Sequence, residues 1–363
     1  MHADRFAEFT TEKGPFASVY YEDSHASEDA AQIAELTWRS IREQLEQLEA
    51  PPPVLDNIER ALAEAPTAIG RGGRAIVANG DKVLVHERLI RPPLRTEVRV
   101  SELPYLLPLV EHGASGRPYL VVAVDHTGGD LTVYDQQGTA LDEETVAGEG
   151  YPIHKASGAQ TPGYGDPEPR VEEQRHRNIA ALADRLTELA DEHRCEPVFV
   201  IGEIRSRSDL VEALPQRIKE VSMQLQTGSR GEGSDRERTG EHIEQALAQQ
   251  RLTEMDETAE RYRAGAGTGL AVEGLSEVTA ALRQRRVDML ILGDLGDVTV
   301  LVGDDPSLVA ADSGALSEMG SGSERIHRAD EALPFAAVTS GAAMLRMDER
   351  LTPADGVAAL LRY

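Results

Sequence analysis

The chain has 363 residues, of which 40% are hydrophobic and 28% charged, a balance typical of globular proteins and not of disordered ones. Its formal net charge of -26 opposes broad adhesion to nucleic acid, so we expect no DNA-binding function. The apolar runs are far shorter than the roughly 20 residues of a membrane helix, no signal peptide is visible, and the single cysteine fits a reducing compartment. We therefore expect a cytoplasmic, multi-domain protein without a membrane partner.

The first part of the sequence, residues 1–116, is predicted to be an N-terminal domain. Its predicted elements are a strand at 15–21, helices at 29–48 and 54–64, and a β-hairpin that turns at Asn79-Gly80. The first helix has apolar residues at helical spacing, namely Ile33, Leu36, Ile41, Leu45 and Leu48. A basic, proline-broken segment follows, with four arginines close together: Arg88, Arg91, Arg95 and Arg99. These arginines belong either to a solvated edge strand or to an RNA-binding patch.

The second part, residues 117–236, is predicted to be a middle domain built around a long loop. Two β runs joined by a Thr-Gly-Gly turn lead into this loop, which spans 149–170 and is rich in Gly and Pro. A helix at 178–193 and a buried strand at 197–201 continue an alternation typical of an α/β layer. The loop ends in a cationic helix start that suits phosphate, with Arg170, Arg175, His176 and Arg177. On physical grounds alone, an ordinary surface loop explains the segment equally well.

The third part, residues 237–363, is predicted to be a compact α/β sandwich. A long helix at 239–265 and a second helix at 273–286 precede strands at 287–292 and 298–303. The end of the chain, from "PFAAVTSGAAMLRM" to "DGVAALLRY", is predicted to add another strand and a small final helix.

The usual signatures of enzymes are missing from the sequence. The glycines of "GAGTGLAVEG" follow a helix and precede no Gly-Lys-Ser/Thr, so they do not form a nucleotide-binding loop. The histidines are scattered and Cys195 has no partner cysteine, so we predict no metal site, no cofactor and a buried, inert thiol. No nucleophile elbow occurs. Asp125-His126, at a strand end, is either an acid–base pair or an Asx turn, and the turn needs fewer assumptions.

Several segments together resemble a known family. "AVDHTGGDLTVY", followed by the long loop and "PVFVIGEIRSRSDL", resembles the middle domain of archaeo-eukaryotic peptide release factors and Pelota. "AVEGLSEVTAALRQRRVDMLILGD" resembles their third domain, which is similar to the kink-turn-binding ribosomal protein fold. "GPFASVYYEDSH", "GYPIHK", "ADEALPFAA" and "DGVAALLRY" are closer to the bacterial branch, which includes actinobacterial dormancy-associated proteins related to the hibernation factor Balon. The resemblance implies an α/β (α+β), three-domain, Pelota-like architecture.

The same resemblance implies a function at the ribosomal A site. The N-terminal domain would lie toward the decoding centre, the middle-domain loop toward the peptidyl-transferase centre, and the C-terminal domain would meet EF-Tu. Release factors carry Gly-Gly-Gln at the tip of this loop to position the hydrolytic water, whereas this sequence contains no Gly-Gly-Gln and has "GYGDPEP" in the region. We therefore expect a hibernation factor that blocks the A site of idle ribosomes and has no catalytic residue.

The position of residues in the loop and behind it predicts contacts with ribosomal RNA, because aromatic rings and guanidinium groups stack on splayed bases. The predicted contacts are Tyr151, His154, Lys155, Tyr164, Gly165, Arg175, Arg177, Arg205 and Arg207. Two other functions stay open. One is peptidyl-tRNA hydrolysis by an unconventional loop that uses Gln160, its only glutamine. The other is an adaptor that binds a protein partner through its acidic surface.

Overall fold

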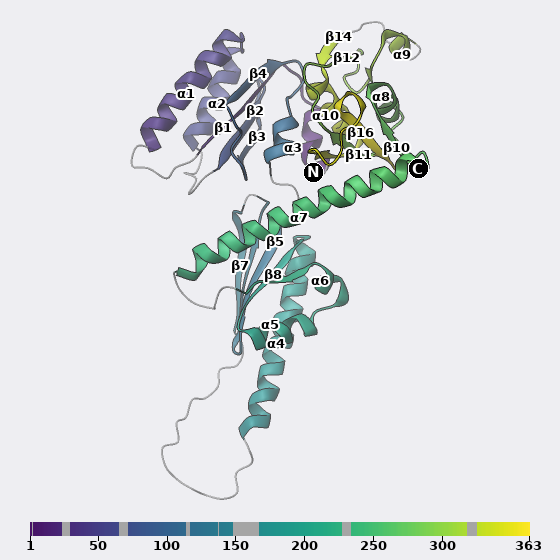
Figure 1. Ribbon diagram of the computed structural model, residues 1–363. Helices are drawn as coiled ribbons and strands as arrows, with labels where there is room; N and C mark the ends of the chain where they lie inside the picture. Colours follow the sequence, from purple (N-terminus) through teal and green to yellow (C-terminus); the bar gives the residue numbers. More distant parts are fainter. Residues whose placement is uncertain are drawn as a thin grey trace, which may run out of the picture. The chain divides into compact units, whose positions relative to one another are not determined.

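The computed structural model (Figure 1) describes residues 1, 3–23, 30–64, 72–113, 117–136, 138–147, 167–226, 234–317 and 325–363. The chain forms two compact units. One consists of Met1–Ser115 together with Leu252–Tyr363, and the other of Gly116–Arg251. The N-terminal and C-terminal parts of the sequence therefore pack in a single unit, while the middle part makes its own. The predicted boundaries at 116 and 236 stay a prediction.

The N-terminal part of the first unit is built on an antiparallel sheet of order β3-β2-β1-β4. Its strands are β1 (Phe16–Glu22), β2 (Gly73–Ala78), β3 (Val83–Leu89) and β4 (Glu97–Ser101). Helices α1 (Ala30–Gln47) and α2 (Pro52–Glu64) cover one face (Figure 1), where Val19 and Ile76 are buried with Ile41 and Ile58. Because side chains alternate along a strand, the side chain of Tyr20 lies on the other face of the sheet, away from α1 and α2. It is buried there together with its neighbours on that face.

The predicted apolar stripe of α1 is only partly used in packing. Ile41 and Leu45 are fully buried, but Ile33, Leu36 and Leu48 are exposed. The helix itself is confirmed at almost its predicted length, and the two strands either side of Asn79-Gly80 are confirmed as β2 and β3. The Asn79 carboxamide oxygen accepts hydrogen bonds from the backbone N–H groups of Asp81 and Lys82, at 3.0 and 2.9 Å, which explains why Asn occupies this turn.

The C-terminal part of the first unit has a mixed sheet of order β10-β16-β11-β15. Its strands are β10 (Ala271–Glu273), β11 (Val287–Leu292), β15 (Ala343–Arg346) and β16 (Val357–Leu361), and β11 pairs with β15 in parallel. Helices α8 (Leu275–Arg283) and α10 (Ala329–Ser340) pack on one face; Met255, Ala259 and Tyr262 of α7 (Ser234–Ala266) pack on the other. A small sheet is formed by β12 (Thr299–Val302), β13 (Val309–Ala310) and β14 (Arg325–Arg328), beside α9 (Ser313–Ser317).

The prediction of a small final helix is wrong, because the end of the chain is strand β16. All five residues of "VAALL" are buried, between β10 and β11 in the middle of the sheet. Alanine and leucine favour a helix in isolation, but a strand that is buried on both faces needs a continuous apolar run of this kind. A single 3₁₀ turn, η2 (Ala354–Gly356), precedes the strand.

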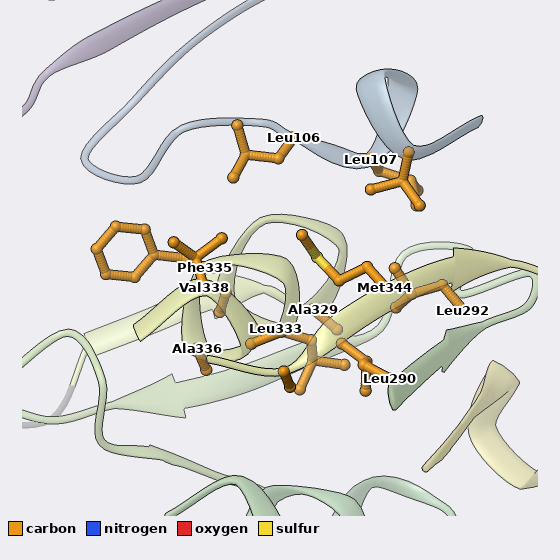
Figure 2. Packing of buried hydrophobic residues seen from close by; sticks show 14 of the residues in the cluster. Leu106, Leu107, Leu290, Leu292, Ala329, Leu333, Phe335, Ala336, Val338 and Met344 are labelled. Carbon is orange, nitrogen blue, oxygen red and sulfur yellow. The ribbon is translucent and has the colours of Figure 1, made fainter. Parts of the chain in front are cut away.

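The two sequence-distant parts of the first unit share one core. Leu106 and Leu107, at the start of α3 (Leu107–His112), face the side chains of Phe335, Val338 and Met344 (Figure 2). The N-terminal 3₁₀ helix η1 (Ala3–Thr10) adds Phe6 and Phe9 to the same cluster. Full burial of one such apolar side chain stabilises the fold by about 1.5–3 kcal/mol. The shared core therefore holds the N-terminal sheet and α10 in a fixed arrangement.

The second unit is a five-stranded sheet of order β7-β6-β5-β8-β9. Its strands are β5 (Tyr119–Asp125), β6 (Gly128–Tyr134), β7 (Ala140–Ala147), β8 (Val198–Gly202) and β9 (Ser222–Gln224). Helices α4 (Pro167–Glu192), α5 (Ile204–Ala213) and α6 (Gln216–Glu220) contribute to the core on one face, and Ile243 of α7 packs on the other. The predicted hairpin, helix and buried strand are confirmed as β5–β6, α4 and β8. Edge strand β7 was not predicted from sequence.

None of the described helices combines the length and apolar character needed to cross a membrane.

Candidate functional site

The candidate site is the N-terminal half of α4 and the helix α5 beside it. Five of the predicted RNA contacts lie outside the described residues: Tyr151, His154, Lys155, Tyr164 and Gly165. The structure does place the other four predicted contacts, which are arginines of α4 and α5. Helix α4 begins at Pro167, three residues before the predicted end of the loop, and proline is well tolerated in a first helical turn because its missing N–H has no partner there.

Arg175 lies between α4 and α5. Only 7% of it is exposed, and its guanidinium forms an ion pair with Asp209 of α5 and lies 4.0 Å from Glu172. Its Nε and the Nδ2 of Asn178 are buried without a hydrogen-bond partner among the described residues. Leaving a buried guanidinium without its partner typically lowers stability by several kcal/mol, so the ion pair of Arg175 holds α4 and α5 together.

Arg207 is also buried and is used inside the second unit. Its guanidinium donates a hydrogen bond to the backbone carbonyl of Leu225, directly after β9. This contact ties α5 to the end of the short edge strand. Together, Arg175 and Arg207 support the position of α5, and RNA could reach neither side chain without rearrangement.

Arg177 and Arg205 present the accessible positive charge of the site. Their side chains are 64% and 67% exposed. Arg177 pairs with Glu173 at 2.7 Å on the same helix, and Arg205 at the start of α5 pairs with Glu172 of α4. Exposed pairs of this kind contribute at most about 1 kcal/mol, so a phosphate group can replace the carboxylate at little cost. The carboxylate partners Glu172, Glu173 and Asp209 were not predicted; only the i,i+4 spacing of Glu173 and Arg177 signalled one of these pairs.

Asp125 and His126 have different partners. The Oδ1 atom of Asp125 accepts hydrogen bonds from the N–H groups of Thr127 and Gly128, at 2.7 and 3.1 Å. This is the Asx turn that closes the β5–β6 hairpin. His126 instead has its Nδ1 atom 3.7 Å from a carboxylate oxygen of Glu203. Of the two alternatives that the sequence left open, the structure shows the turn.

The four N-terminal arginines do not act as one patch. The Arg99 guanidinium points into the first unit, where it binds Asp330 and Glu331. Arg88 is half-buried on β3 beside Gly72. Arg91 and Arg95 are exposed in the segment between β3 and β4. The structure therefore divides the predicted patch into structural and accessible members, and RNA contact by any of them stays a prediction.

Comparison with known proteins identifies the family. A family model described as bacterial archaeo-eukaryotic release factor family 2 matches residues 118–268, which hold the candidate site. The uncharacterized protein Rv2629 of Mycobacterium tuberculosis strain ATCC 25618/H37Rv is 44% identical over 365 residues, covering 100% of this chain and 97% of the relative. The uncharacterized protein MT2704 of strain CDC 1551/Oshkosh gives the same values. The chain belongs to one family with these two mycobacterial proteins, and its residues 118–268 belong to bacterial archaeo-eukaryotic release factor family 2.

Solved structures similar to this chain include two of archaeal Pelota. Archaeoglobus fulgidus Pelota is 16% identical with a TM-score of 0.36, covering 81% of this chain and 84% of Pelota. A model of ribosome-bound archaeal Pelota and ABCE1 is 14% identical with a TM-score of 0.43, covering 99% and 93%. The predicted mixed α/β, release-factor-like architecture is confirmed by the family and the observed elements. A kink-turn-binding type of C-terminal domain stays a prediction.

Among the described residues, the accessible surface of the site offers the positive charge of Arg177 and Arg205. No cluster of three or more His, Cys, Asp or Glu suited to a metal ion occurs among the described residues. Burial raises the pKa of the Cys195 thiol to about 11, which keeps this one thiol protonated near neutral pH. What the arrangement can do chemically is bind anionic groups through Arg177 and Arg205.

Proposed function

We propose that this protein occupies the A site of idle ribosomes and blocks translation without chemistry, as a hibernation factor related to Balon. The observation that carries the proposal is the loop between β7 and α4, which belongs to a release factor family but has no Gly-Gly-Gln. Without this motif the loop has no means of positioning a hydrolytic water in the manner of release factors. A cytoplasmic location and a role in dormancy follow from the same proposal.

The accessible arginines support ribosomal RNA as the partner. Arg177 lies on α4 and Arg205 at the start of α5, and among the described residues both make exposed ion pairs. Exchanging these carboxylates for RNA phosphates gives charge-assisted hydrogen bonds at a cost of about 1 kcal/mol or less. Arg175 and Arg207 hold the two helices that carry these arginines. The C-terminal part would meet EF-Tu, which a pull-down with and without nucleotide tests separately.

The proposal is tested by sedimentation of the full chain with vacant ribosomes at physiological salt, followed by a peptidyl-tRNA release assay. We expect stoichiometric binding and release no faster than in buffer. The variant Arg177→Glu/Arg205→Glu should weaken binding and lower the slope of log K against log salt by about 1.4, because two phosphate contacts are lost. The matched control is Arg117→Glu/Arg217→Glu, which also replaces two half-exposed, ion-paired arginines of the second unit.

The outcomes separate this function from its alternatives. Binding with release that is lost in Gln160→Ala would make the protein a peptidyl-tRNA hydrolase. Equal weakening by the test and control pairs would mean that bulk charge, and not the site, drives binding. A chain that never sediments with ribosomes would instead be an acidic adaptor for another protein.

A further inference from the structure

Helix α1, which covers the N-terminal sheet (Figure 1), has an uncharged face that is open to solvent. At about 100° per residue, six uncharged side chains lie within about 60° of one line along the helix. They are Ile33, Leu36, Thr37, Ser40, Gln44 and Leu48, and we call them the α1 face. Its three apolar members are 50%, 52% and 46% exposed, in a chain of which 28% is charged. Apolar groups grouped in this way on a surface mark a contact site.

The charged side chains of α1 lie on its other sides. Arg39 pairs with Glu35 at 3.1 Å, and Arg42 pairs with Glu46 at 3.1 Å, so these four charges are grouped on the side of the helix opposite the α1 face. The side chains that hold α1 on the sheet, Ile41 and Leu45, are a different set again. The α1 face therefore has no part in the ion pairs of the helix or in its packing on the sheet.

The charge of the protein decides which partner suits this face. Two copies of a chain with a formal charge of -26 repel each other, and at physiological salt this repulsion acts over about 8 Å. Close approach of two copies therefore needs a contact surface that is free of charge, which the α1 face provides. Binding to RNA needs cations, and binding to an anionic membrane needs a basic helix with a larger apolar face. The α1 face fits neither, so its chemistry favours a second copy.

We propose that two copies of the chain pair through their α1 faces, with the helices antiparallel about a two-fold axis beside Ser40. In such a contact, residue i of one copy meets residue j of the other, and j meets i. Ile33 then meets Leu48 of the second copy, Leu36 meets Gln44, and Ser40 meets its own equivalent. The pair has apolar contacts at both ends and a polar centre. Within one helix the Nε2 of Gln44 donates to the Oγ of Ser40 at 3.4 Å, and its second N–H is free to donate across the axis.

The contact is small, so the dimer is weak. The α1 face is about 22 Å long at 1.5 Å per residue, and a single pair of helices of this length buries less than a standard-size interface. We expect a dissociation constant on the order of 10–100 μM. Added salt should strengthen the dimer, because it screens the repulsion between two acidic chains, whereas it weakens binding to RNA. The inference is independent of the proposed function, and its tests contain no ribosomes.

The first test is sedimentation equilibrium of the full chain over a range of concentrations, at low and at high salt. We expect a monomer–dimer equilibrium that salt shifts toward the dimer. Ser40→Glu places two carboxylates against each other at the axis and should raise the dissociation constant at least about tenfold. The matched control is Ser208→Glu, the same substitution at an exposed position of α5, which should leave the constant unchanged. A chain that stays monomeric, a dimer that salt weakens, or equal effects of the two substitutions would overturn the inference.

The second test locates the contact by crosslinking with a short bis-maleimide. The single native thiol, Cys195, is buried, so the wild-type chain gives the background. Ser40→Cys should yield a covalent dimer, because the two new thiols face each other across the axis. The matched control is Glu46→Cys, at an exposed position on another side of α1, which should not exceed the background. Equal crosslinking of both variants would indicate random collisions and overturn the inference. A dimer in sedimentation that Ser40→Cys fails to crosslink would assign the contact to another surface and overturn it too.

Discussion

The guanidinium of Arg99 and the carboxylate of Asp330 form a bidentate ion pair, at 3.1 and 3.0 Å, between residues 231 positions apart in the chain. Arg99 also donates to Glu331 at 3.1 Å, and its guanidinium lies 3.4 Å from the ring centroid of Tyr105. Both carboxylates are buried in the first turn of α10, where the helix dipole favours negative charge. This cluster joins β4 of the N-terminal sheet to α10 beside their shared apolar core.

Removing Arg99 is expected to destabilise the first unit strongly. Arg99→Ala leaves two buried carboxylates with fewer partners, and breaking a buried pair in this way typically costs about 3–5 kcal/mol. The sole tryptophan, Trp38, lies on α1 of the same unit, so its fluorescence during urea unfolding reports that unit. Arg39→Ala removes an exposed arginine paired with Glu35 and should cost less than about 0.5 kcal/mol. Equal, small effects of both substitutions would mean that the cluster contributes nothing to stability.

The same cluster should make the first unit sensitive to acid. Burial by itself raises the pKa of Asp330, but hydrogen bonds from Arg99 and Arg328 outweigh it and lower the pKa below its usual value. A lowered folded-state pKa contributes stability above the unfolded value of about 3.9, and this contribution is lost as pH falls below it. The midpoint of urea unfolding should therefore drop between about pH 4 and pH 2. In Asp330→Asn the drop should be shallower; an unchanged profile would assign the acid sensitivity to other carboxylates.

Local patterns in the sequence were sufficient for the elements that depend on local chemistry. The Asn79-Gly80 turn, helix α1 and the β5–β6 hairpin each have their signal within a few neighbouring residues. Strand β16 was mistaken for a helix because its apolar run has no period, and only its place between β10 and β11 makes it a strand.

The roles of the arginines could not be predicted from sequence, since a buried and an exposed arginine look alike there. Arg175 and Arg177 are two residues apart on α4, yet one meets Asp209 on another helix and the other faces solvent. The same holds for Arg95 and Arg99, because the partner of Arg99 lies in the last third of the chain. Long-range pairing decides which arginines are buried and which are accessible, and one sequence carries no signal for it.

Gly202 is expected to tolerate no side chain. It connects β8 to α5 with φ +117°, and an added Cβ would lie 2.0 Å from the backbone oxygen of Val124. Gly202→Ala should cost more than about 3 kcal/mol, because both the backbone strain and the clash must be relieved. For Gly240, inside α7, no atom of the described residues lies within 4 Å of such a Cβ, so Gly240→Ala should be neutral or stabilise by up to about 1 kcal/mol. Thermal unfolding followed by circular dichroism compares the two. A Gly202→Ala chain as stable as wild type would show that the paired ends of β5 and β8 can shift apart freely.

The buried thiol gives a direct measure of how tightly the second unit is closed. Cys195 follows α4 and is packed with Leu189, Ala190 and Val198, and burial raises its pKa to about 11. A free thiol with a pKa of about 8.5 is partly thiolate at pH 8, whereas the native thiol is almost wholly protonated. We expect reaction with an aromatic disulfide reagent at pH 8 to be at least about a hundredfold slower in native protein than in urea. Arg175→Met, which breaks the link between α4 and α5, should raise the native rate, and Arg177→Met should leave it unchanged. Rapid labelling of the wild-type chain would mean that α4 leaves the sheet often, and the rigid support proposed for Arg177 and Arg205 would be lost.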